Sequence, residues 1–173
     1  MEKIDNLIKE INENLDFLFS DYGFQKPVIK NIAYEYSCIL KNKNVELIFL
    51  TELRSISVPD IIFKISRTQY DLNNLSEKNK LKEITENNYN RTNPITENLV
   101  NQYVRKKIYN DTELINDFET IGKSDINDLI LEIAKIFKDN PTILKGNRFP
   151  FFKAKWKKFK SQLPTMGIIH CFL

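Results

Sequence analysis

The sequence predicts an α+β fold, in which an antiparallel sheet of three or four strands is covered by helices that precede and follow it. Residues 28–66 carry three apolar runs with strand-like spacing, separated by short polar breaks. The segments on both sides of this stretch carry apolar residues at helical spacing instead. At 173 residues, one domain over residues 1–173 is expected.

Residues 2–22 have the clearest helical pattern in the chain. Gly23 follows at the position where a left-handed C-cap is expected. We therefore predict one helix that ends at Gly23 and lays a wide apolar stripe on the sheet. The stripe consists of Ile4, Leu7, Ile8, Ile11, Leu15, Leu18, Phe19 and Tyr22.

The three strand-like runs cover about residues 34–40, 45–50 and 56–65. Between the first and second runs lies Lys41-Asn42-Lys43-Asn44, a polar segment that is typical of a turn. Pro59 lies inside the third run and has no N–H for a ladder hydrogen bond. The third strand is therefore predicted to be an edge strand or to be split by a bulge.

An asparagine-rich stretch follows the sheet, at about residues 68–94. Apolar residues thin out here, and Leu75, Leu81 and Ile84 could anchor one short helix. We predict that the rest is a surface insert.

Two further helices are predicted before Pro141. The first covers about residues 96–109, and the second begins at Ser124 as N-cap with Asp125 in its first turn. The second helix should bury Ile126, Leu129, Ile130, Leu131, Ile133, Ala134, Ile136 and Phe137.

Gly122-Lys123-Ser124 is similar to the end of a phosphate-binding P-loop. That motif needs a glycine where this chain has Asp117, and it needs a buried strand before it. We therefore interpret these residues as the cap of the helix that follows.

The charge of the chain is divided unevenly. Residues 141–173 contain seven lysine or arginine residues and no acidic residue, which gives a charge of +7. Because the whole chain has a net charge of +3, residues 1–140 carry −4. A basic C-terminal segment favours partners of negative charge.

This basic segment contains a predicted helix between Pro150 and Pro164. Its aromatic and aliphatic residues share one face, and lysines occupy the others. Three interpretations are open: the aromatic face packs on the core, it stacks with nucleic-acid bases while lysines contact phosphates, or it binds a protein of opposite charge. The aromatic face consists of Phe152, Trp156, Phe159 and Leu163, with Phe149 and Phe151 nearby.

For a binding role, the candidate residues all belong to this segment. We expect a protein partner first and nucleic acid second, with no membrane association. The candidates are Arg148, Lys153, Lys155, Trp156, Lys157, Lys158 and Lys160.

Catalytic chemistry is not evident in the sequence. The one histidine, His170, lies beside Cys171 near the C-terminal end, and the other cysteine, Cys38, lies in a strand pattern. These are too few ligands for a metal site and do not form a nucleophile–base pair. We expect a protein that is not an enzyme and needs no cofactor. Its first residues include acids and lack a signal-peptide pattern, so a cytoplasmic location is expected.

Three local patterns together suggest a family. The first helix ends in Asp21-Tyr22-Gly23-Phe24, a tyrosine-rich strand runs through Tyr34-Glu35-Tyr36-Ser37, and Ile143-Leu144-Lys145-Gly146-Asn147 follows a late helix. This arrangement resembles small bacterial families of unknown function that include immunity-type proteins of polymorphic toxin systems. The resemblance implies a non-catalytic protein that occludes a toxin by shape and charge, and it implies no particular binding residues.

Overall fold

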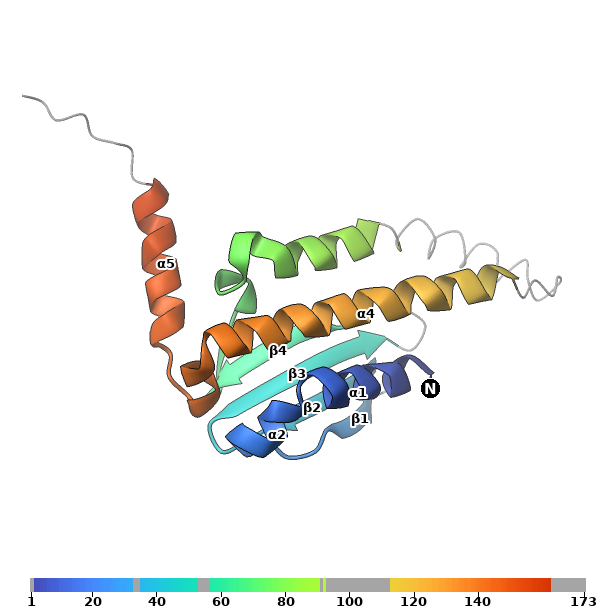
Figure 1. Ribbon diagram of the computed structural model, residues 1–173, viewed down its shortest axis with the longest axis horizontal. Helices are drawn as coiled ribbons and strands as arrows, with labels where there is room; N and C mark the ends of the chain where they lie inside the picture. Colours follow the sequence, from blue (N-terminus) through green and yellow to red (C-terminus); the bar gives the residue numbers. More distant parts are fainter. Residues whose placement is uncertain (1, 33–34, 53–56, 91, 93–112, 163–173) are drawn as a thin grey trace, which may run out of the picture.

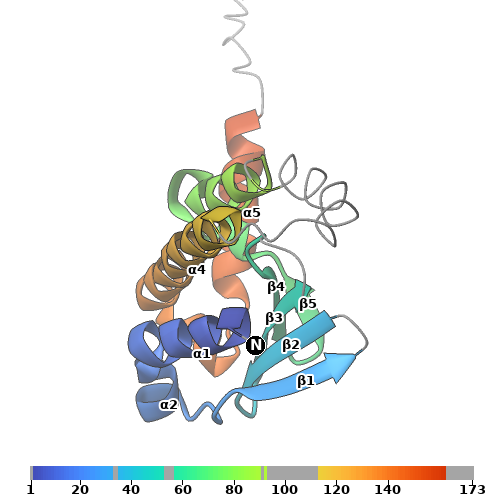
Figure 2. The ribbon, with the colours of Figure 1, turned by 90° about the vertical axis from the view of Figure 1, so that its right-hand side faces the viewer.

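The computed structural model describes residues 2–32, 35–52, 57–90, 92 and 113–162. Five antiparallel strands form one sheet, and helices lie against one of its faces (Figures 1 and 2). The predicted α+β class is therefore confirmed, with one strand more than the upper expected number. The elements are α1 (Glu2–Asn14), α2 (Asp16–Tyr22), β1 (Val28–Ile32), β2 (Glu35–Lys41), β3 (Val45–Glu52), β4 (Asp60–Ile65), β5 (Thr68–Tyr70), the short 3-10 helices η1 (Leu72–Asn74) and η2 (Glu77–Asn79), a helix over residues 80–90, α4 (Glu113–Asp139), η3 (Pro141–Lys145) and α5 (Phe149–Gln162).

The strands are ordered β1-β2-β3-β4-β5, so each strand pairs with its neighbours in the sequence. Neither β1, which precedes the first predicted run, nor β5, which is only three residues long, was predicted as a strand. Pro59 precedes β4 and does not interrupt it, and β4 pairs with β3 on one side and with β5 on the other. The prediction of an edge strand was therefore wrong, because β5 covers the second half of β4.

One face of the sheet forms the core with the helices. Cys38 and Leu40 of β2, Leu47 and Phe49 of β3, and Phe63 of β4 point to this face and are buried. On the opposite face, Val28, Ile39, Ile48 and Ile62 lie in one row across β1 to β4. None of the described helices packs on that row (Figure 2).

The first predicted helix is two helices. Leu15 has φ −119° and ψ 20°, which interrupts the helix between α1 and α2. Asp16 then starts α2, and its Oδ1 accepts a hydrogen bond from the Phe17 N–H at 2.7 Å. The predicted cap is confirmed: Gly23 has φ 64°, and its N–H donates to the Leu18 carbonyl oxygen.

Helix α4 begins at Glu113, eleven residues before the predicted start. Ser124 and Asp125 therefore lie inside the helix, and the prediction of a cap at Ser124 was wrong. The predicted buried face is confirmed at every position except Leu131, which is 46% exposed. Gly122-Lys123-Ser124 also lies within this helix, without the preceding strand that a P-loop requires.

The asparagine-rich stretch is more structured than a surface insert. Leu81 is buried, as the predicted anchor of a short helix should be, but Asn88 and Thr92 are buried as well. The helix over residues 80–90 runs beside α4 (Figure 1). The predicted helix at about 96–109 lies outside the described residues.

Candidate protein-binding surface

Helix α5 starts from a rigid junction at the end of α4. Gly146 caps η3 with φ 90°, and a Cβ at this position would lie 3.1 Å from the Asn44 Cβ. Asn147 Oδ1 then accepts the Phe149 N–H at 2.9 Å, and Pro150 occupies the first turn of α5. From this junction α5 points away from the sheet (Figure 1).

A single side chain, Phe151, joins the first turn of α5 to the core. Phe151 is 6% exposed, and its ring centroid lies 4.7 Å from that of Tyr70 and 6.0 Å from that of Phe63. Phe63 also contacts Phe137 of α4 at 5.7 Å. These aromatic contacts fix the start of the helix and its rotation about its own axis.

This rotation turns the predicted aromatic face outward. Phe149, Phe152 and Trp156 are 65%, 59% and 61% exposed, whereas the expectation of core packing required burial. That interpretation was wrong for Phe152 and Trp156, because Phe151 occupies the opposite side of the helix and is the residue that meets the sheet. The side chain of Phe159, and Leu163 as a whole, lie outside the described residues.

The exposed rings surround a hollow with a volume of about 560 Å³. Phe149, Phe152 and Trp156 line it together with Lys153 and Lys155. We call these five residues the α5 face. It combines an apolar hollow with a cationic border, which is the composition of a surface that binds an acidic partner.

The predicted site residues do not all belong to the α5 face. Lys153, Lys155 and Trp156 belong to it, and Lys157 and Lys158 are exposed on neighbouring positions of the helix. Arg148 is half-buried and precedes α5, and the side chain of Lys160 is outside the described set. Phe152 was absent from the candidate residues, and Phe149 was considered only as an aromatic anchor near Trp156, although their spacing from Trp156 already placed all three on one side.

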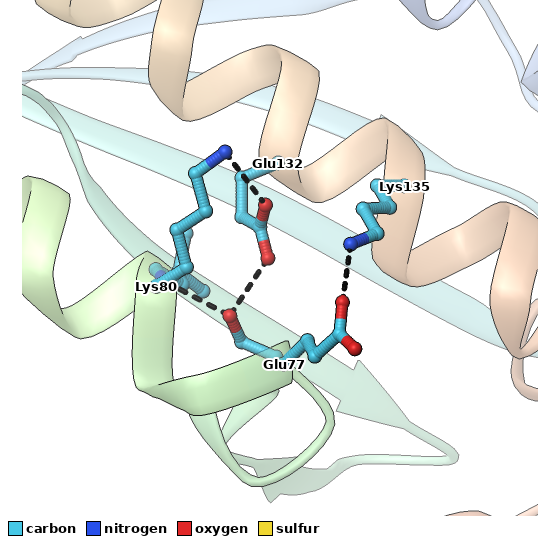
Figure 3. Close-up of polar contacts among 6 residues, drawn as sticks. Glu77, Lys80, Glu132 and Lys135 are labelled. Atoms are coloured by element: carbon cyan, nitrogen blue, oxygen red, sulfur yellow. Dashed lines mark hydrogen bonds and ion pairs between the residues drawn. The ribbon is translucent and has the colours of Figure 1, made fainter.

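A cluster of buried polar side chains on α4 was not predicted from the sequence. Glu132 is 3% exposed, and its Oε1 accepts the Ser76 hydroxyl at 2.8 Å. The other carboxylate oxygen lies 3.8 Å from Lys80 Nζ, as Figure 3 shows. The Ser76 Oγ also accepts the Leu81 N–H at 2.9 Å, so its donor and an acceptor position are both in use.

Two helical turns before Glu132 on α4, Asp125 makes a similar buried contact. Its Oδ2 accepts from Asn88 Nδ2 at 2.6 Å, and Asn88 Oδ1 accepts the Val58 N–H at 2.8 Å.

At the surface, Lys135 Nζ donates to Glu77 at 2.7 Å (Figure 3). This contact lowers the pKa of Glu77 and raises the pKa of Lys135, first through the hydrogen bond and then through charge attraction. These contacts tie residues 76–88 to α4, and we assign them a structural role.

The described residues include no group of three or more His, Cys, Asp or Glu side chains that could hold a metal ion. Cys38 is buried, and desolvation raises the pKa of its thiol to about 12. His170 and Cys171 lie outside the described residues.

The comparisons with known proteins give no family for this chain. No protein-family model, no curated protein and no solved structure matches it. Among the described helices, none combines the length and the apolar character needed to cross a bilayer.

Proposed function

We propose that this chain is a binding protein that recognises another protein through the α5 face. The observation that supports this most strongly is the exposure of three aromatic rings on one side of a helix, at 59–65% each. Scattered exposed apolar residues are ordinary, but contiguous aromatic residues are typical of interaction sites.

The charge around the rings defines the chemistry of the partner. The C-terminal segment supplies seven cations and no acid, so its partner should present carboxylates around an apolar protrusion. Such a protein would act by covering its partner and needs no reactive group.

The resemblance to immunity-type proteins extends this proposal to a bacterial toxin as the partner and to the cytoplasm as the place of action. The cognate toxin gene should then lie next to the gene for this chain. Expression of that neighbouring gene alone should stop growth, and co-expression of this chain should restore it. Trp156→Ala should abolish this rescue. A central aromatic residue of an interface contributes about 2 kcal/mol or more, which corresponds to a loss in affinity of about 30-fold.

A matched control is available on another helix. Tyr89, in the helix over residues 80–90, is 59% exposed, so Tyr89→Ala removes an aromatic ring of similar exposure away from the α5 face. This variant should rescue growth as the wild type does. A neighbouring gene product that is harmless, or equal rescue by Trp156→Ala, would contradict the proposal.

Nucleic acid is the second candidate partner, favoured by the exposed lysines of α5. Its binding would weaken steeply as salt rises and would be lost when Lys155, Lys157 and Lys158 are replaced by Glu. Tight, salt-sensitive binding of this kind in the absence of any protein partner would replace the first proposal. Binding to anionic lipid vesicles that depends on Trp156 would do so as well.

A further inference from the structure

A second charged surface lies on the sheet, at the end where two hairpin turns meet. The β2–β3 turn and the β4–β5 turn border an open groove of about 490 Å³. Four cationic side chains line it: Lys41 at the end of β2 and Lys43 in the β2–β3 turn, and Lys64 of β4 and Arg67 in the β4–β5 turn. The Ser66 N–H donates to the Asn44 carbonyl oxygen at 3.0 Å, which holds the two turns side by side.

Only one of these cations is neutralised. Lys64 Nζ lies 3.3 Å from Glu46, which also lines the groove. Lys41, Lys43 and Arg67 form no ion pair with any other residue that the structure describes. Residues 1–140 carry a net charge of −4, so this gathering of cations runs against the charge of the surrounding chain. Like charges in one groove repel each other, and a bound anion removes that repulsion.

The backbone that carries these side chains is well fixed. Asn42 Oδ1 accepts the N–H groups of Asn44 and Val45 at 2.9 and 2.8 Å, and its Nδ2 donates to the carbonyl oxygens of Tyr22 and Leu144 at 3.0 Å each. Asn42 therefore connects the turn to both α2 and η3. A groove with a fixed backbone loses less entropy when a ligand binds.

The β4–β5 turn is equally defined. Ser66 and Arg67 both have positive φ, at 48° and 74°, in a two-residue hairpin turn where asparagine and glycine are usual. The left-handed backbone conformation at Arg67 is unfavourable for a residue with a side chain, and the side chain that it carries lines the groove.

We infer that this groove binds a compact oligophosphate through Lys41, Lys43 and Arg67. An arginine guanidinium donates two parallel hydrogen bonds to a phosphate group, and lysines act as point charges beside it. The residues that line the groove include no aromatic ring, so they offer nothing on which a base could stack. Recognition would rest on the phosphate chain, whether it is inorganic triphosphate or part of a nucleotide.

The test is a calorimetric titration of the full chain with inorganic triphosphate at low ionic strength, without divalent metal. We expect saturable binding with one site per chain that weakens as salt rises. Lys43→Ala and Arg67→Ala should each lower the affinity by about tenfold, because each removes a charge-assisted contact. Lys41→Ala serves as a second variant on the same groove, should either of these fail to fold.

Charge-matched controls separate a site from general attraction. Lys9→Ala and Lys82→Ala each remove one positive charge from an exposed position outside the groove and should change the affinity by less than about twofold. ATP distinguishes the sources: equal affinity would indicate the inorganic chain, and tighter binding would indicate a nucleotide. Absence of binding, or equal losses in these control variants, would overturn the inference. So would a short RNA that requires Arg67 and binds when triphosphate does not.

Discussion

Helices α4 and α5 carry similar apolar spacing, yet they use it in opposite ways. In α4 the apolar face is closed by the sheet and by α1, and Leu129, Ile130 and Ile133 are fully buried. In α5 only Phe151 is buried among the aromatic residues whose side chains are described, and the rings at 149, 152 and 156 face outward. Figure 1 shows the cause: α4 crosses over the sheet, whereas α5 leaves it at one end.

This difference teaches that spacing identifies an apolar face but not what covers it. The cover depends on where the helix starts and on how it is rotated, and both are set by contacts far away in the sequence. For α5 those contacts are made by Tyr70 and Phe63. An apolar face intended for a partner therefore has the same sequence pattern as a core face.

The largest expected effect tests the closed side of the comparison. Phe137→Ala should lower the free energy of unfolding by about 3–5 kcal/mol, because it opens a cavity next to Phe63. Leu131→Ala, on the exposed side of the same helix, should change it by less than about 1 kcal/mol. Urea denaturation measures both, and similar losses would mean that the two sides of α4 are equally packed.

Two adjacent residues of α5 sharpen the comparison within one helix. Phe151→Ala should cost about 2–4 kcal/mol in the free energy of unfolding, whereas Phe152→Ala should cost less than about 0.5 kcal/mol. Partner binding should respond in the opposite order. A larger loss of stability for Phe152→Ala would show that Phe152, and not Phe151, is the residue that faces the core.

The buried polar contacts of α4 provide the next test, since none is described for α5. Asn88→Ala should lower the free energy of unfolding by about 1–3 kcal/mol, because Asp125 and the Val58 N–H both lose a buried partner. Asn90→Ala, at an exposed position of the same helix, should have an effect below about 0.5 kcal/mol. Equal effects in chemical denaturation would argue that residues 80–90 do not depend on α4.

The smallest effect concerns the thiol beneath the helices. Cys38 is 2% exposed, and burial raises its pKa to about 12 from 9.0. In a Cys171→Ser variant, a thiol reagent should label the folded chain slowly and the urea-unfolded chain fast. The unfolded thiol ionises above about pH 9 while the folded one stays protonated, so this group lowers stability as pH rises from about 9 towards 12. Fast labelling of the folded chain would show that the helices do not close this face.

Much of the fold could be predicted from local pattern, and the remainder depended on distant contacts. The pairing of β2, β3 and β4, the cap at Gly23 and the buried face of α4 all follow from spacing and turn chemistry. The start of α4 could not be located, because Ser124 is a good N-cap that the helix passes through. The burial of Asn88 was hidden as well, because its partners Asp125 and Val58 are far away in the sequence.

The candidate site was predicted in part, for the same reason. The lysines and Trp156 stood out by charge and composition. The outward direction of the rings could not be known, since it depends on Phe151 reaching Tyr70 and Phe63. The hairpin groove was missed because Lys43 and Arg67 are brought together only by strand pairing.

The most direct test of the central claim uses the only tryptophan in the chain, Trp156. Its fluorescence in the folded protein, without any partner, reports whether the α5 face is open to solvent. With the indole 61% exposed, a small neutral quencher should reach it nearly as fast as in the urea-unfolded chain, with a similar emission maximum. Strong protection from the quencher and a clearly blue-shifted emission would show that the chain itself covers this face, and would contradict the account.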